Sequence, residues 1–203
     1  MRNCLPSTAI TRNSMKCRVS FLLKTYLWTV MVFIIAKVVF MLCCQEEHAL
    51  SAGDMWQVIV HGLTLDLSTA LYFLILPFLL VLASIWHVGK WIGIVLRVYF
   101  AIIALTFALA LVADISLYPF WHFKLDASCI QYLETPTEAM ASVSWAFYAM
   151  RFVIWLLAAW LIYIVYSFSV RSLRTVSPQP SDWKSAAFGL LTFLVSIPLF
   201  IIG

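Results

Sequence analysis

Long apolar runs separated by short polar segments extend along the chain, and each run is long enough to cross a membrane. A helix needs about 20 predominantly apolar residues to span the hydrocarbon core of a bilayer. The pattern predicts five transmembrane helices, at about 21–44, 55–86, 92–118, 145–170 and 185–203. Because the apolar residues form continuous blocks and not alternating strands, we expect an all-α fold and not a β-barrel.

The composition excludes an ordinary soluble domain. Hydrophobic residues make up 64% of the chain and charged residues 11%, and the mean hydropathy is +0.99. Soluble domains usually carry roughly 25% charged residues. The chain therefore has the composition of a polytopic membrane protein, with membrane lipids as its surroundings and no nucleic-acid partner expected.

The distribution of basic residues predicts the orientation. Residues 1–20 contain four basic residues and no acid, which is typical of a cytoplasmic segment that leads into an uncleaved signal-anchor helix. An N-terminus in the cytoplasm places ten of the thirteen basic residues on that side, as the positive-inside rule requires. These ten are Arg2, Arg12, Lys16, Arg18, Lys24, Lys90, Arg97, Arg171, Arg174 and Lys184. Residues 21–203 would then form a five-helix domain whose last helix ends outside.

The longest interruption of the apolar pattern, residues 114–142, is predicted to form an outer loop. The Tyr118–Pro119 step should end the third helix, since proline disfavours a helical conformation in the residue before it. Further on, Leu125, Ile130 and Leu133 alternate with polar residues. This spacing predicts a short amphipathic helix that lies on the membrane surface.

Five polar residues in the outer halves of the predicted spans form the candidate site: Lys37, His61, Asp66, Asp114 and Arg151. A charged residue within a membrane helix costs about 2.5 to 3.5 kcal/mol on insertion scales, so each needs a partner or access to water. One interpretation is a pocket in which basic side chains hold an anionic lipid headgroup. A second is a set of interhelical ion pairs. A third is a proton or ion path, although the sequence shows neither the internal repeats nor the paired broken helices of many transporters.

The cysteines indicate no metal site. None of the five lies in a Cys-x-x-Cys spacing, and we expect no cofactor or metal within this chain. Cys43 or Cys44 could meet Cys129 in a disulfide if the outer side is oxidising. The alternative is that all five act as small apolar residues.

Two segments resemble the membrane portion of the lipoteichoic acid synthase family. These are HGLTLDLSTALYFLILPFLL (61–80) and ADISLYPFWHFKLDASCIQYLETPTEAMAS (113–142), with the patterns D-x-x-x-Y-x-F-W and L-D-x-x-x-x-x-Y-L-x-T-P. The likeness is greatest to the sulfatase-like or phosphoglycerol transferase-like members of the Bacteroidetes. The residues related to the family pattern, without individual roles, are Asp66, Asp114, Tyr118, Trp121 and Asp126.

The resemblance implies a multi-pass protein of the bacterial inner (cytoplasmic) membrane. In that family five helices anchor an extracytoplasmic domain, which uses a threonine nucleophile and a divalent metal, typically manganese, to move phosphoglycerol from a lipid donor. No threonine in this chain has the family's nucleophile context. We therefore expect the catalytic domain to lie beyond Gly203, as a partner of an anchor that is inactive alone. The alternative is a complete small membrane protein, either a transporter subunit or an assembly partner.

Overall fold

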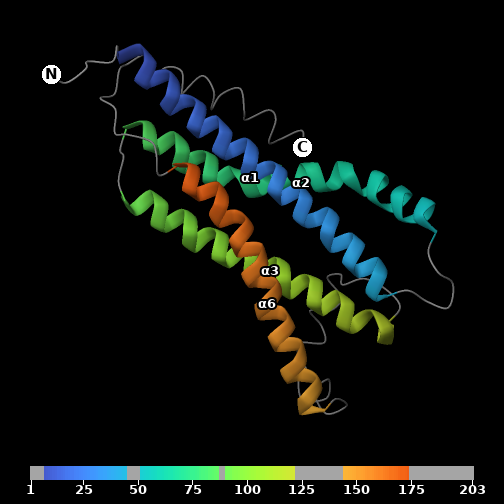
Figure 1. Cartoon of the computed structure of the whole chain (residues 1–203). Coiled ribbons are helices and arrows are strands. Elements are labelled where there is room, and N and C mark those ends of the chain that lie inside the picture. Colours follow the sequence, from blue (N-terminus) through green and yellow to red (C-terminus); the bar gives the residue numbers. More distant parts are fainter. Residues whose placement is uncertain (1–6, 45–50, 87–89, 122–143, 174–203) are drawn as a thin grey trace.

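The described part of the chain, residues 7–44, 51–86, 90–121 and 144–173 of a computed structural model, is all-α. It contains four long helices: α1 (Ser7–Cys43), α2 (Ala52–Trp86), α3 (Lys90–Trp121) and α6 (Trp145–Leu173) (Figure 1).

Each helix contains a stretch that is long and apolar enough to cross a membrane. These stretches are Cys17–Cys43, Ala52–Ser84, Trp91–Pro119 and Trp145–Arg171. Even the shortest helix, with 29 residues, is roughly 43 Å long at 1.5 Å per residue, which exceeds a hydrocarbon core of about 30 Å. The chain is thus a multi-pass membrane protein with four candidate spans among its described residues, whose helices tilt or extend beyond the core.

Two of the helices, α1 and α3, extend beyond boundaries that the sequence predicts. α1 begins at Ser7 and not near residue 21, because no proline or glycine interrupts the chain between the basic segment and the apolar run. The prediction that Pro119 ends the third helix is wrong, since α3 continues through it to Trp121. A proline this close to a helix end removes one backbone hydrogen bond and leaves few later turns to disturb.

Several predictions from the sequence lie outside the described residues. They are the fifth span (185–203), the surface helix within 122–143, and the roles of Asp126 and Cys129.

Successive helices run in opposite directions (Figure 1). The starts of α1 and α3 gather at one end of the bundle with the ends of α2 and α6. This alternation is what repeated crossing of one bilayer requires. The cytoplasmic placement of the N-terminus stays a prediction.

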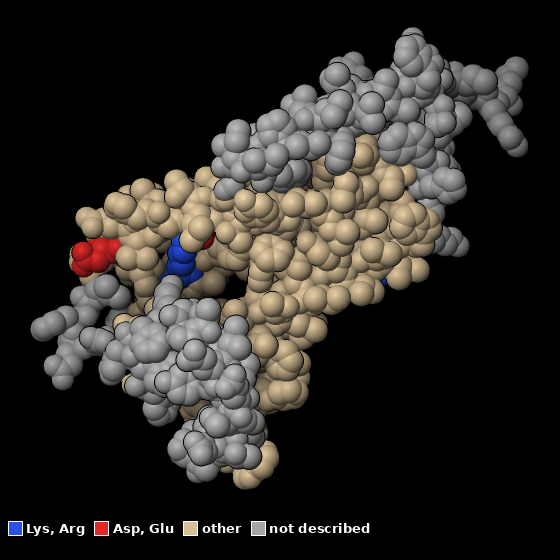
Figure 2. Space-filling model, turned by 180° about the vertical axis from the view of Figure 1, so that it is seen from behind, with Lys and Arg blue, Asp and Glu red and all other residues tan. Residues whose placement is uncertain are grey.

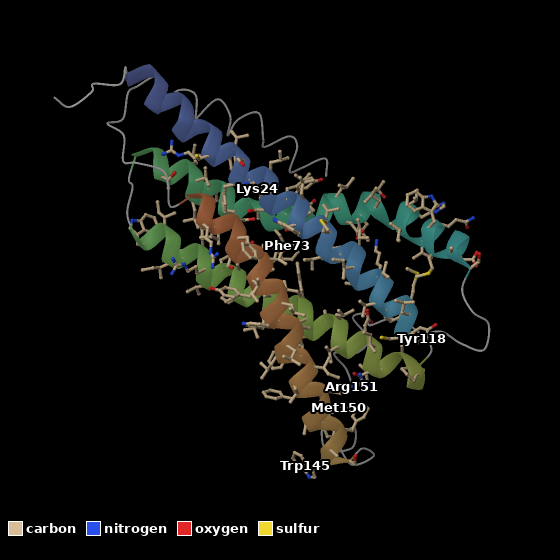
Figure 3. The ribbon with its side chains drawn as sticks, viewed as in Figure 1. Lys24, Phe73, Tyr118, Trp145, Met150 and Arg151 are labelled. Carbon is tan, nitrogen blue, oxygen red and sulfur yellow. The ribbon has the colours of Figure 1, made fainter. Side chains whose placement is uncertain are left out.

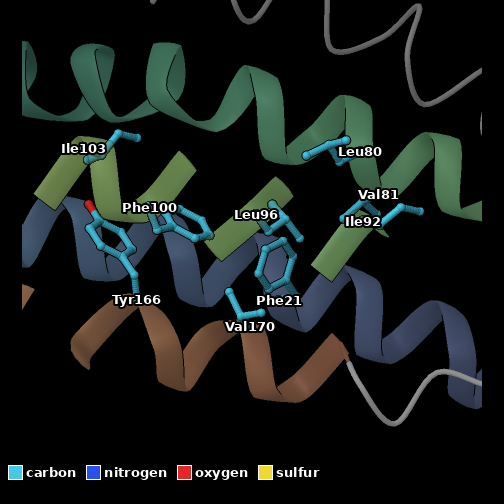
Figure 4. Close-up of a cluster of buried hydrophobic side chains, with 9 residues drawn as sticks. All are labelled: Phe21, Leu80, Val81, Ile92, Leu96, Phe100, Ile103, Tyr166 and Val170. Atoms are coloured by element: carbon cyan, nitrogen blue, oxygen red, sulfur yellow. The ribbon is translucent and has the colours of Figure 1, made fainter. Parts of the chain in front are cut away.

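Nine buried hydrophobic residues from all four helices form the core (Figure 4). They are Phe21, Leu80, Val81, Ile92, Leu96, Phe100, Ile103, Tyr166 and Val170. α1 packs against each of the other three helices, and α3 packs most extensively on α6.

Within this core, Tyr166 of α6 stacks on Phe100 of α3, with ring centroids 4.7 Å apart and planes 8° from parallel. Its hydroxyl lies 3.0 Å from Oγ1 of Thr29 on α1. Thr29 donates its own proton to the Thr25 carbonyl at 2.9 Å, so Tyr166 acts as the donor to Thr29. The buried hydroxyl of Tyr166 therefore links α6 to α1, and it is itself satisfied by a hydrogen bond, as buried polar groups usually are.

Removing this hydroxyl tests its contribution. Tyr166→Phe keeps the stack on Phe100 and is expected to lower the free energy of unfolding by about 1 kcal/mol, the usual net value of one hydrogen bond. Tyr163→Phe is the matched control, since Tyr163 is half-buried on the same helix. Reversible unfolding in mixed micelles gives both values, and equal losses in the two variants would contradict the assignment.

Candidate functional site

The structure joins two of the predicted polar residues in an ion pair between α1 and α2. Nζ of Lys37 lies 2.7 Å from Oδ2 of Asp66. The Lys37 side chain is 20% exposed and that of Asp66 is 8% exposed. At this distance the contact is a charge-assisted hydrogen bond as well as an ion pair.

A glycine makes room for this contact. Gly62 lies one turn before Asp66, so the two residues share a face of α2. A Cβ atom built on Gly62 would collide with Nζ of Lys37. Glycine in a helix interior costs up to about 1 kcal/mol relative to alanine, and here its missing side chain lets the ammonium lie directly against α2.

The pairing offsets part of the cost of placing two charges inside candidate spans. Lys37 lies in Cys17–Cys43 and Asp66 in Ala52–Ser84. Opposite charges at hydrogen-bonding distance offset each other's loss of water, whereas a single charge there has no such compensation. The pair as a whole carries no net charge.

Two other members of the predicted site, His61 and Arg151 (labelled in Figure 3), make their described contacts within their own helices. His61 is exposed, and its Nδ1 lies 2.8 Å from the Gln57 carbonyl of its own helix. The guanidinium of Arg151 lies over the Phe147 ring of α6, with Cζ 5.0 Å from the centroid. Its Nε is buried without a hydrogen-bond partner.

Apart from Asp66 on α2, the residues of the family pattern lie toward the end of α3 or beyond it. Asp114 is half-buried on α3. Tyr118 packs edge-on against Phe40 of α1, with ring centroids 5.1 Å apart. Trp121 is the last residue of α3, and Asp126 lies outside the described residues.

Sequence reasoning missed a second interhelical charge contact, at the opposite end of the bundle. Arg18 is only 6% exposed, and its Nη2 donates to the Ser84 carbonyl at 2.9 Å. Ser84 is in the last turn of α2, where carbonyls have no partner within the helix and the dipole favours a cation. The available signal was the stripe of Arg18, Phe21, Thr25 and Thr29, whose helical spacing places them on one face of α1.

Comparison with known protein families, with curated proteins and with solved structures finds no match to this chain. Among the residues that the structure describes, no group of three or more His, Cys, Asp or Glu side chains is placed to hold a metal ion. The fold and the site therefore define the chain as a multi-pass membrane protein. The family resemblance stays a prediction.

The ion pair predicts a strong difference between single and double substitutions. Lys37→Met or Asp66→Leu alone leaves one charge without its partner, and each should destabilise the bundle by about 3 to 5 kcal/mol. The double variant should recover most of this loss, because neither charge remains. Reversible unfolding of the three variants in mixed micelles measures the coupling, and additive single effects would contradict a direct pair.

Gly62 allows a second test of the same contact. Gly62→Ala should displace the Lys37 ammonium from Asp66 and lower the melting temperature. Gly93→Ala on α3 is the matched control, since a Cβ there meets nothing within 4 Å, and it should be neutral or slightly stabilising. In the Lys37→Met/Asp66→Leu background, Gly62→Ala should no longer lower the melting temperature. A decrease that persists in this background would show that the substitution strains α2 itself.

Proposed function

We propose that this chain is the membrane anchor of an extracytoplasmic enzyme of the sulfatase and alkaline phosphatase superfamily. The enzyme would be a phosphoglycerol transferase that acts on lipid-linked substrates at the outer face of the bacterial inner membrane. The observation that supports an anchoring role is that polar side chains inside the bundle bind one helix to the next.

These polar links connect the four helices in a ring. The Lys37–Asp66 pair and the Arg18–Ser84 contact join α1 to α2. The Tyr99 hydroxyl of α3 donates to the Phe73 carbonyl of α2 at 2.8 Å. Nε1 of Trp155 on α6 donates to the Leu105 carbonyl of α3 at 2.9 Å.

The Tyr166–Thr29 bond between α6 and α1 closes the ring. Each helix is thus tied to two neighbours by hydrogen bonds as well as by packing. Transport by alternating access needs one part of a bundle to rock against another. A bundle fastened on all sides is better suited to hold an attached domain at a fixed place on the membrane.

The resemblance supports the proposed chemistry. Residues 61–80 resemble the membrane portion of the lipoteichoic acid synthase family, and so do residues 113–142, which contain both patterns. In such an enzyme a threonine nucleophile and a divalent metal of the outer domain would carry the transfer. The described helices would supply attachment and position, and no step of the reaction.

Two measurements test this proposal. The coding DNA beyond codon 203 should continue into several hundred residues with a threonine nucleophile and metal ligands. The 203-residue chain alone, in vesicles of phosphatidylglycerol, should release or transfer no phosphoglycerol.

The extended protein should transfer phosphoglycerol, and replacing its threonine nucleophile with alanine should abolish the transfer. A stop codon directly after Gly203 would overturn the anchor proposal and favour a transporter subunit or assembly partner. Transfer activity in the 203-residue chain would overturn it as well.

A further inference from the structure

The Lys37–Asp66 pair is partly exposed at the surface of the bundle, mainly through the Lys37 side chain. A lysine ammonium has three N–H donors, and its described hydrogen bond to Asp66 uses one of them. The bond engages Oδ2 of the carboxylate, and Oδ1 accepts no hydrogen bond from a described side chain. Within the described part of the chain, both charged groups therefore keep hydrogen-bonding capacity beyond this one bond.

The space-filling view shows where basic and acidic groups are exposed together on one face of the molecule. In Figure 2, blue basic atoms and a small red acidic area lie side by side on this face of the molecule. Lys37 and Asp66 are the ion pair within the described helices. Gly62 next to them contributes no side chain, so α2 presents bare backbone beside the ammonium.

The depth of Lys37 suits a lipid headgroup. The residue lies a little under two turns before Cys43, the last residue of α1, or roughly 9 Å along the helix axis. Lysine side chains within about this distance of a helix end reach the headgroup region. A lipid beside the bundle can thus bring its phosphate to the partly exposed ammonium of Lys37.

Charge decides which headgroup fits. An anionic headgroup would gain from Lys37, but it would meet the carboxylate of Asp66 only 2.7 Å from the same ammonium. A zwitterionic headgroup has one group for each: its phosphate accepts from Lys37, and its ammonium donates to Asp66. A trimethylated ammonium has no N–H to donate, whereas a primary ammonium has three.

We propose that Lys37 and Asp66 bind the headgroup of a phospholipid that carries a phosphate and a primary ammonium, as phosphatidylethanolamine does. The site requires only that the bundle is in a membrane. It does not depend on the proposed attachment to an enzyme, so either proposal can fail without the other.

The test is a melting-temperature titration of the full chain in detergent micelles. Phosphatidylethanolamine, phosphatidylglycerol and phosphatidylcholine with identical acyl chains are compared. We expect phosphatidylethanolamine to raise the melting temperature most. The double variant Lys37→Met/Asp66→Leu should bind it about tenfold more weakly, the loss typical of charge-assisted hydrogen bonds.

Lys24→Met is the matched control, because Lys24 is an exposed lysine on the same helix and should leave the lipid response unchanged. If the double variant does not fold, the wild-type chain still gives a test. Stepwise methylation of the headgroup nitrogen should then reduce the stabilisation in proportion to the N–H donors lost.

Four results would overturn the proposal. Equal stabilisation by all three lipids, or an unchanged response in the double variant, would make the pair an interhelical tie only. A greater effect of phosphatidylglycerol would assign the site to anionic headgroups. Binding of soluble O-phosphoethanolamine as tight as that of the lipid would show that the ligand is not a membrane lipid.

Discussion

A charge inside the bilayer has to be compensated by another group of the protein, and in this bundle that constraint fixes α1 against α2. Two contacts do so, Arg18 to Ser84 and Lys37 to Asp66. The two residues on α1 are 19 positions apart, and their partners on α2 are 18 positions apart in the reverse order, as expected for two antiparallel helices held in one register. Because the contacts lie toward opposite ends of the α1 span, sliding or tilting α1 against α2 would expose a charge at one of them.

The α3–α6 half of the bundle is held mainly by packing. Both helices bury small residues inside the bundle. Among these are Ala104 and Ala108 on α3 and Ala159 on α6. Small residues allow helices to approach closely in a membrane, where van der Waals contact takes the place of the hydrophobic effect. The stack of Tyr166 on Phe100 belongs to this interface. The Tyr166–Thr29 bond then couples the apolar half to the α1–α2 pair, whose register the charges set.

The four described spans could be predicted from the sequence because an apolar run of given length is a local property. The start of α1 and the passage of α3 through Pro119 could not, since a helix ends where its backbone loses partners and not where hydropathy changes. Charged residues in the spans imply that each has a partner, but the sequence does not say which of the five candidate residues pair. The fold decides this by placing Lys37 against Gly62. The sequence places Arg18 in a basic cytoplasmic segment and does not reveal its partner, because the acceptor is a backbone carbonyl that no sequence pattern marks.

Stability alone does not explain a charge pair at this place. Replacing a buried ion pair with well-packed apolar residues is often neutral or stabilising, by about 1 to 4 kcal/mol in measured cases, and apolar side chains at positions 37 and 66 would join α1 and α2 without a desolvation cost. A pair that is partly exposed at Lys37 and lies beside a glycine provides what apolar packing cannot, namely two opposite charges fixed at one place between α1 and α2. The same contact can therefore set the register of the helices and present a polar surface to the surrounding lipid.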